Sequence, residues 1–136
     1  MDRDIEIMAR TIYGEARGEY HKKNGGIEAL AAVGHVIMNR AIRSGSSIES
    51  ECLKPWQFSC WNKNDPNRKV IENVTLENPI YKLCYIVAKR VICNEIEDIT
   101  GGSTHYYSAY MKNPPYWAKN KPPTAKIGSH IFFKLH

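Results

Sequence analysis

Apolar residues recur every three to four positions in three stretches of the chain, and this spacing predicts three amphipathic helices. The first covers residues 2–17. The second covers residues 27–43, and because apolar side chains occupy two of its faces, we expect it to be the most buried helix. The third covers residues 79–95, with Asn78 as its N-cap and Pro79 at the first helical position.

The helical spacing ends near Gly101, and aromatic and β-prone residues follow. Residues 103–108 and 130–134 predict two short strands that pair with each other. The connection between them, residues 109–129, contains two Pro-Pro pairs and is too long for a tight hairpin. Long connections in compact domains are often functional, so this segment is a candidate for substrate contacts.

Length and composition indicate a single globular domain spanning residues 1–136. A chain of 136 residues has room for one hydrophobic core and little more. No apolar run approaches the roughly 20 residues of a membrane span. Acidic residues also stand at the N-terminus, where a signal peptide would carry basic ones. We therefore expect a monomer that is made in the cytoplasm and has no membrane partner.

The net charge of +5 favours an anionic polymer as partner. The 19 Lys and Arg residues are scattered rather than gathered in a block, so nucleic acid is not the expected polymer. The cysteines Cys52, Cys60, Cys84 and Cys93 are expected to be reduced and buried. An unexported chain of this size does not need disulfides, and the cysteine spacing differs from that of structural zinc sites.

One glutamic acid, Glu15, occupies a position suited to acid catalysis. It lies at the edge of the apolar stripe of the first helix, and Glu19 would lie within the stripe if the helix continued. Partial burial favours the protonated form of a carboxyl group, which a glycosidase needs in its proton donor. The flanking Gly14 and Gly18 have no side chains, so we expect a bulky polymer to reach the carboxyl. The alternative is that Glu15, Arg17 and Glu19 are solvated surface residues at a helix end.

Aromatic residues gather in two segments, and those in loops are candidates for binding sugars. Rings suit sugars because a sugar presents apolar C–H faces and polar edges. Half or more of these rings are expected in the core, whereas Tyr110 and Trp117 are expected to line a groove. The two segments contain Trp56, Phe58 and Trp61, and Tyr106, Tyr107, Tyr110, Tyr116 and Trp117.

Other chemistries have less support in the sequence. The chain has no glycine-rich phosphate loop, no Gly-x-Ser-x-Gly motif and no His-Glu-x-x-His zinc motif. His35 falls in the second helix and is expected to be a core residue with satisfied hydrogen bonds. His105 and His130 lie on the two predicted strands, where they are candidates to meet, but a third metal ligand is hard to name. We therefore expect no metal and no other cofactor.

Several of these segments together resemble the SleB-type cell-wall hydrolases, the family that includes spore-cortex-lytic enzymes. The resemblance covers nearly the whole chain, with residues 62–77 as the exception. The run Gly-Glu-Ala-Arg-Gly-Glu at residues 14–19 is its most distinctive part. The matching segments are residues 9–19, residues 29–40, Gln57-Phe58-Ser59, residues 100–107 and residues 127–133.

The resemblance implies a small α+β catalytic domain, mainly helical with a short antiparallel sheet and distantly similar to lysozyme-like lytic transglycosylases. It implies that Glu15 is the catalytic acid. The residues expected to contact the substrate are Gln57, Phe58, His105, Tyr106, Tyr107, Trp117, His130 and Glu19. Because the chain has no export signal or wall-binding repeats, we expect a phage or prophage lysin, or an excised catalytic domain, rather than a spore enzyme.

The expected reaction is cleavage of the β-1,4 bond between N-acetylmuramic acid and N-acetylglucosamine in peptidoglycan, with Glu15 protonating the glycosidic oxygen. In a lytic transglycosylase, the same carboxylate then takes a proton from the muramoyl C6 hydroxyl, and an anhydro ring closes without water. A hydrolase needs a second carboxylate, and the nearby candidates Glu19 and Glu28 have no convincing setting. We therefore favour the transglycosylase; a muramidase-type hydrolase and a non-catalytic wall-glycan-binding module are the alternatives.

The two aromatic segments are expected to form opposite walls of one groove over Glu15. Successive strand residues point to opposite faces of a sheet, so only one of Tyr106 and Tyr107 can face this groove while the other packs inward. The loop that holds Phe58 is expected to close the other side of the groove.

Overall fold

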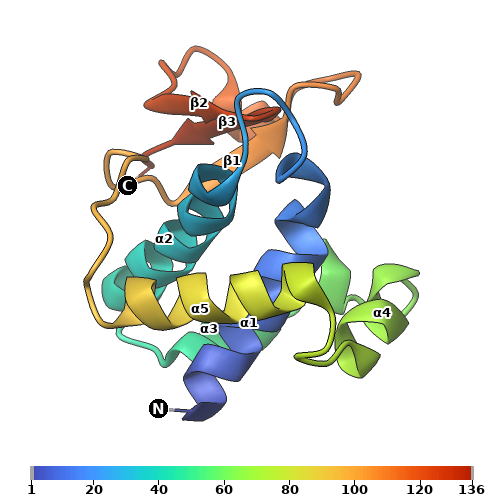
Figure 1. Ribbon diagram of the computed structural model, residues 1–136. Helices are drawn as coiled ribbons and strands as arrows, with labels where there is room; N and C mark the ends of the chain where they lie inside the picture. The colour runs from blue at the N-terminus through green and yellow to red at the C-terminus, as the bar shows by residue number, and fades with distance from the viewer. Residues whose placement is uncertain (1, 136) are drawn as a thin grey trace.

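Five α-helices, three 3₁₀ helices and three strands follow one another along residues 2–135, the part of the chain that this computed structural model describes (Figure 1). The α-helices are α1 (Asp2–Ala16), α2 (Ile27–Ser44), α3 (Ile48–Leu53), α4 (Asn67–Asn73) and α5 (Pro79–Ile92). The strands are β1 (His105–Ser108), β2 (Ala125–Ile127) and β3 (His130–Phe133), and the 3₁₀ helices are η1 (Arg17–Glu19), η2 (Ser59–Trp61) and η3 (Tyr116–Ala118).

The three predicted helices are confirmed as α1, α2 and α5, with ends that differ by one to three residues. The predicted cap of α5 is present, because the Asn78 side chain accepts hydrogen bonds from the backbone N–H groups of Ile80 and Tyr81. Helix α2 ends at Ser44 and is capped by Gly45, whose φ of 66° places it in the left-handed region that favours glycine. The short helices α3 and α4 were not predicted, because six or seven residues are too few to show helical periodicity.

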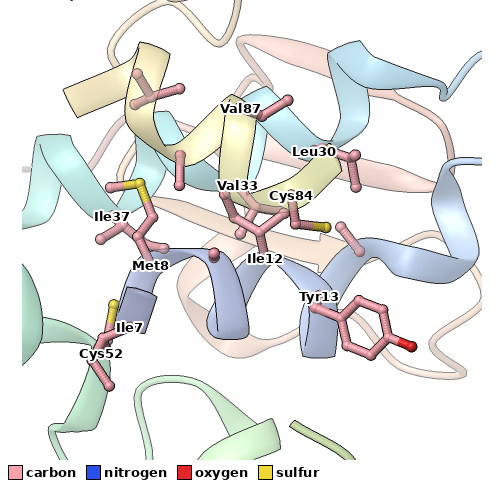
Figure 2. Packing of buried hydrophobic residues seen from close by; sticks show 14 of the residues in the cluster. Ile7, Met8, Ile12, Tyr13, Leu30, Val33, Ile37, Cys52, Cys84 and Val87 are labelled. Atoms are coloured by element: carbon pink, nitrogen blue, oxygen red, sulfur yellow. The ribbon is translucent and has the colours of Figure 1, made fainter. Parts of the chain in front are cut away.

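The core lies between α1, α2 and α5, whose apolar faces meet (Figure 2). Every residue of α2 from Ala29 to Ile37 is buried, which confirms that this helix is the most enclosed.

His35 belongs to this buried run, but its expected full set of hydrogen bonds is not present. Its Nε2 atom has no partner among residues 2–135. Burial lowers the pKa of His35, so the imidazole is neutral at pH 7.

The sheet is antiparallel with the strand order β1-β3-β2, and it lies at one end of the helical part, beside the beginning of α2 (Figure 1). The predicted pairing of β1 with β3 is confirmed. Strand β2 was not predicted, because its three residues lie inside the segment expected to be a loop. Ile127 and Phe132 on the inner face pack on Ala29, Ala32 and Val36 of α2, which fixes the sheet on the helices.

The cysteines are free thiols, as expected. Cys52, Cys60 and Cys84 are buried, and burial raises the pKa of Cys52 and of Cys84 to about 12. These thiols are therefore protonated at neutral pH. The expectation of burial is wrong for Cys93, which is exposed at the C-terminal end of α5.

Within residues 2–135, none of the helices has the length and apolarity that a bilayer span requires.

A candidate active site around Glu15

Glu15 is held by two segments that are distant from it in sequence. It stands in the last turn of α1 and is partly exposed, as predicted. The Tyr106 hydroxyl of β1 donates a hydrogen bond of 2.7 Å to its Oε1. The backbone N–H of Cys60 in η2 donates one of 3.2 Å to its Oε2. Each carboxylate oxygen thus has one protein donor, and the orientation of the carboxyl group is fixed.

Gly14 allows η2 to approach α1 closely enough for this contact. A Cβ atom at Gly14 would lie 2.7 Å from the Cβ of Cys60 and 2.9 Å from the Cγ2 of Ile71. This corrects the expectation that Gly14 makes room for the substrate, because the space is filled by the protein. Gly18 is different: a Cβ there would have no atom within 4 Å, so the surface beside Gly18 is open.

Tyr106 and Tyr107 point to opposite faces of the sheet, as the strand pattern predicted. The Tyr106 ring lies on the inner face, 4.7 Å from the His130 ring. Burial, and then the charge of Glu15, raise the pKa of Tyr106 well above its usual value, so its hydroxyl remains a donor. Tyr107 stacks on Phe133 on the outer face, with the ring centroids 5.7 Å apart. Tyr106 is therefore the tyrosine that faces Glu15.

His105 and His130 do not meet, which corrects the expectation from the predicted strands. In the register of the sheet, His105 pairs with Phe133 and His130 pairs with Ser108, so the two imidazoles lie on opposite faces. His105 packs on Trp117 at 5.0 Å between ring centroids. Burial, and then nearby arginine charges, lower the pKa of His105 to about 4. Among residues 2–135 no three metal-ligating side chains converge.

His130 lies beside Tyr106 and is buried. Its Nδ1 atom has no hydrogen-bond partner within the described part of the chain. Burial lowers the pKa of His130, and this effect exceeds the opposite influence of the Glu19 and Glu15 carboxylates. At neutral pH His130 is thus an uncharged ring that packs against Tyr106 close to Glu15.

The carboxylate of Glu19 is used to hold the turn between β2 and β3. Its Oε1 accepts a hydrogen bond of 2.5 Å from the backbone N–H of Ser129, and the Ser129 hydroxyl lies 2.8 Å from both oxygens. Lys22 Nζ donates to Oε2 at 2.9 Å. Burial by itself would raise the pKa of Glu19, but these hydrogen bonds outweigh it and the pKa is lowered. Glu19 is therefore a buried ionised group with a structural role, rather than an available substrate contact.

The loop at residues 56–61 closes one side of Glu15, but its Phe58 is not at the surface. Phe58 is 2% exposed, which corrects the expectation of a direct substrate contact. Its ring lies 5.3 Å under the guanidinium group of Arg40. Arg40 also donates to the Gln57 side chain and to the Thr104 carbonyl, the latter at 2.6 Å. Arg40 thus ties this loop to the start of β1, so that both partners of Glu15 are positioned by one side chain.

Of the two rings expected to line a groove, Tyr110 reaches solvent and Trp117 does so only in part. Trp56, Tyr110 and Tyr116 are 85%, 77% and 91% exposed. Trp117 is half-buried against the outer face of the sheet. Trp61 donates from its indole N–H to the Thr11 hydroxyl at 2.8 Å and is part of the packing. Trp56 and Tyr110 are thus the rings available to a sugar near the segments that contact Glu15.

Two components of the site were not identified from the sequence. The backbone N–H of Cys60 could not be predicted, because every residue except proline has such a group and the side-chain pattern does not mark it. Arg40 lies within the segment of residues 29–40 that carries the family resemblance, and an arginine at the end of a buried helix was the available signal. The role of Arg40 depends on its contacts with the loop at residues 56–61 and with Thr104, and only the fold brings these two segments together.

Comparison with known sequences agrees with the family resemblance of the sequence motifs. A family model described as Cell Wall Hydrolase matches residues 25–133. A spore cortex-lytic enzyme of Halalkalibacterium halodurans is 27% identical over 135 residues, which is 96% of this chain and 34% of that protein. The spore cortex-lytic enzyme of Bacillus subtilis is 25% identical over 133 residues, which is 95% of this chain and 37% of that protein. The chain spans little more than a third of the length of these curated relatives.

Two solved structures share the fold over nearly the full chain. The catalytic domain of the Bacillus cereus SleB protein aligns with a TM-score of 0.74 and 25% identity, covering 98% of this chain and 91% of that one. The catalytic domain of the germination-specific lytic transglycosylase SleB from Bacillus anthracis aligns with a TM-score of 0.72 and 25% identity, covering 98% and 96%. The predicted fold, a mainly helical α+β domain with a short antiparallel sheet and a resemblance to lytic transglycosylases, is confirmed.

Proposed function

The chain belongs to the cell wall hydrolase family, and on this premise we propose that it cleaves the glycan strands of peptidoglycan with Glu15 as the proton donor. One observation carries the assignment of Glu15. Its carboxyl group is partly exposed, and a half-buried tyrosine hydroxyl and a backbone N–H fix its orientation. A carboxyl that is held in this way and still reaches solvent is suited to proton transfer with a bound polymer.

The proposed bond is the β-1,4 link between N-acetylmuramic acid and N-acetylglucosamine. Glu15 gives its proton to the glycosidic oxygen, the C1–O bond of the muramoyl sugar breaks, and an oxocarbenium-like centre develops at C1. Tyr106 and the Cys60 N–H keep the resulting carboxylate in place, because both donate to it. The same carboxylate then accepts the proton of the muramoyl C6 hydroxyl, whose oxygen bonds to C1 and forms the anhydro ring. Glu15 is protonated again at the end.

The state of the other carboxylates favours this route over hydrolysis. A hydrolase requires a second carboxylate roughly 5 to 10 Å from the first. The Glu19 carboxylate is occupied by Ser129 and Lys22, and Glu28 is an exposed residue in the first turn of α2. The relative from Bacillus anthracis is described as a lytic transglycosylase, which also supports the one-carboxylate route.

The test is the replacement of Glu15 by Gln, with Glu28→Gln as a matched control. The amide keeps the shape of the side chain but cannot donate a proton, so wall lysis should fall by about a hundredfold or more while the melting temperature is retained. Glu28→Gln should keep its activity, because this carboxylate is exposed. Lysis is followed as loss of turbidity of purified peptidoglycan. More than a few per cent of residual activity in the Glu15 variant would refute the assignment.

The products distinguish the remaining alternatives. A wall-binding module without catalysis releases no soluble fragments. A transglycosylase releases fragments with 1,6-anhydromuramoyl ends, and a hydrolase releases fragments with reducing ends that carry one more water. Mass spectrometry of the soluble fraction separates the three outcomes.

A further inference from the structure

A cavity of about 360 Å³ lies at the turn between β2 and β3. We call it the lysine pocket, because Lys22, Lys23 and Lys126 line it together with Tyr110 and Ser129. Its walls come from three parts of the chain: the loop before α2, the segment after β1 and the β2–β3 hairpin. The mechanism proposed above uses none of these side chains.

The base of the lysine pocket is held in place by buried hydrogen bonds. Glu19 binds the backbone N–H and the hydroxyl of Ser129. The Gly128 N–H donates to the Asn24 carbonyl at 2.7 Å. Gly128 has a φ of 60°, and a Cβ atom there would lie 2.5 Å from Glu19 Oε1, so this turn requires glycine. The pocket is therefore formed before any ligand binds.

Lys22 and Tyr110 are also fixed relative to each other. Lys22 Nζ donates to Glu19 Oε2 at 2.9 Å and to the Ser129 hydroxyl at 3.1 Å, and it lies 4.6 Å from the centre of the Tyr110 ring. The contact with Lys22 holds a ring that is 77% exposed. Most of this ring is open to an apolar sugar surface.

The lysine pocket carries uncompensated positive charge. The charge of Lys22 is balanced by Glu19, but neither Lys23 nor Lys126 makes an ion pair within residues 2–135. Among residues 2–135, no acidic side chain lines the cavity. A hollow surface with unpaired ammonium groups attracts an anion more strongly than a flat one, because the low-dielectric walls concentrate the field.

A short series of contacts connects the lysine pocket with Glu15. Ser129 in the pocket precedes His130, whose ring lies 4.7 Å from Tyr106, and the Tyr106 hydroxyl donates to Glu15. The pocket is therefore joined to Glu15 through Ser129, His130 and Tyr106, so that a polymer bound at Glu15 could extend to it.

We propose that the lysine pocket is a binding subsite for an anionic substituent of the glycan strand, with Tyr110 contacting the attached sugar. The inference rests on the proposed function, because peptidoglycan supplies the strand. The shared chemistry is an oxyanion attached to the glycan, and two sources supply it. One is the carboxylate of a peptide stem, and the other is the phosphate of a phosphodiester polymer linked to the wall.

The experiment compares two double variants with the same net charge. Lys23→Gln/Lys126→Gln removes the unpaired charges of the lysine pocket, and Lys69→Gln/Lys82→Gln removes two exposed lysines on α4 and α5. Binding to purified sacculi is measured by co-sedimentation in the Glu15→Gln background, so that cleavage does not disturb the measurement. We expect the pocket variant to bind about tenfold more weakly than the control variant at low salt, and the difference to shrink as salt screens the charges.

Chemically altered sacculi identify the anion. The difference between the two variants should disappear on sacculi with amidated stem carboxylates if the carboxylate is the ligand. It should disappear after hydrogen fluoride removes phosphodiester polymers if the phosphate is the ligand. A neutral N-acetylglucosamine oligomer should bind both variants equally.

Equal weakening in both double variants would overturn the inference, as would a difference that persists on the neutral oligomer. A difference that survives both chemical treatments would overturn it too. Failure of the protein to bind any sacculi also counts against the subsite. The two proposals can also fail separately. If the unmodified protein releases no fragments from sacculi, but the lysine-pocket variant still binds more weakly than the control variant, the subsite is supported and only the cleavage reaction is refuted.

Discussion

At the scale of single residues, the contact from Tyr106 to Glu15 can be tested by removing one oxygen atom. Tyr106→Phe keeps the ring beside His130 and removes the donor to Oε1, so wall lysis should fall by about tenfold to a hundredfold, the value of one hydrogen bond to a charged group. Initial rates are compared well below both melting temperatures, because loss of this hydrogen bond also lowers the stability of the fold. Tyr107→Phe is the control, because its ring stacks on Phe133 on the other face. Equal effects of the two changes on initial rates would contradict the assigned orientation.

Trp56 combines two unusual properties at one position. It is 85% exposed, and its φ of 66° lies in the left-handed region, which costs a non-glycine residue about 1 to 2 kcal/mol. We predict that Trp56→Gly and Trp56→Ala weaken sugar binding equally, because both remove the ring. The Gly variant should be about 1 kcal/mol more stable than the Ala variant, because only Gly relieves the backbone. Urea unfolding and co-sedimentation with sacculi measure the two effects, and an Ala variant as stable as the Gly variant would exclude backbone strain.

At the scale of elements, the contact between α1 and η2 determines whether Glu15 has its second donor. Gly14→Ala places a methyl group 2.7 Å from Cys60, so η2 must move away. We predict a loss of about 1 to 3 kcal/mol in unfolding free energy, as for other overpacked sites, together with reduced lysis. Gly18→Ala, where nothing lies within 4 Å, should keep both stability and activity. Comparable losses in the two variants, measured by denaturant titration, would show that close packing at Gly14 is not the cause.

At the scale of the whole molecule, Glu19 joins the segment after α1 to the sheet through Ser129. The pKa of Glu19 in the folded protein lies below its ordinary value of 4.5. The ionised carboxylate therefore adds to the free energy of unfolding, and this contribution has its full value above about pH 4.5. This contribution is lost as the pH falls through the lower pKa of the folded state. We predict that Glu19→Gln costs about 2 kcal/mol at pH 7 and that the deficit narrows below pH 4.5. Unfolding curves between pH 7 and pH 3 test this, and a deficit that is constant with pH would contradict it.

The sequence by itself determined the three long helices and the pairing of β1 with β3, and it pointed to Glu15 as the candidate proton donor. A long helix buries the same face over several turns, so its apolar residues recur every three to four positions. This spacing predicted α1, α2 and α5. The alternation of a strand likewise placed Tyr106 and Tyr107 on opposite faces. The motif at residues 14–19 identified the carboxyl group through its family resemblance.

Only the tertiary structure decided what surrounds that carboxyl group. The donors to Glu15 are 45 and 91 residues away in sequence, and one of them is a backbone group that every residue type offers. The roles of Gly14, Phe58 and Glu19 were predicted incorrectly for the same reason. Local pattern shows that a residue is small, aromatic or acidic, but whether it meets solvent or another part of the chain depends on packing between distant segments.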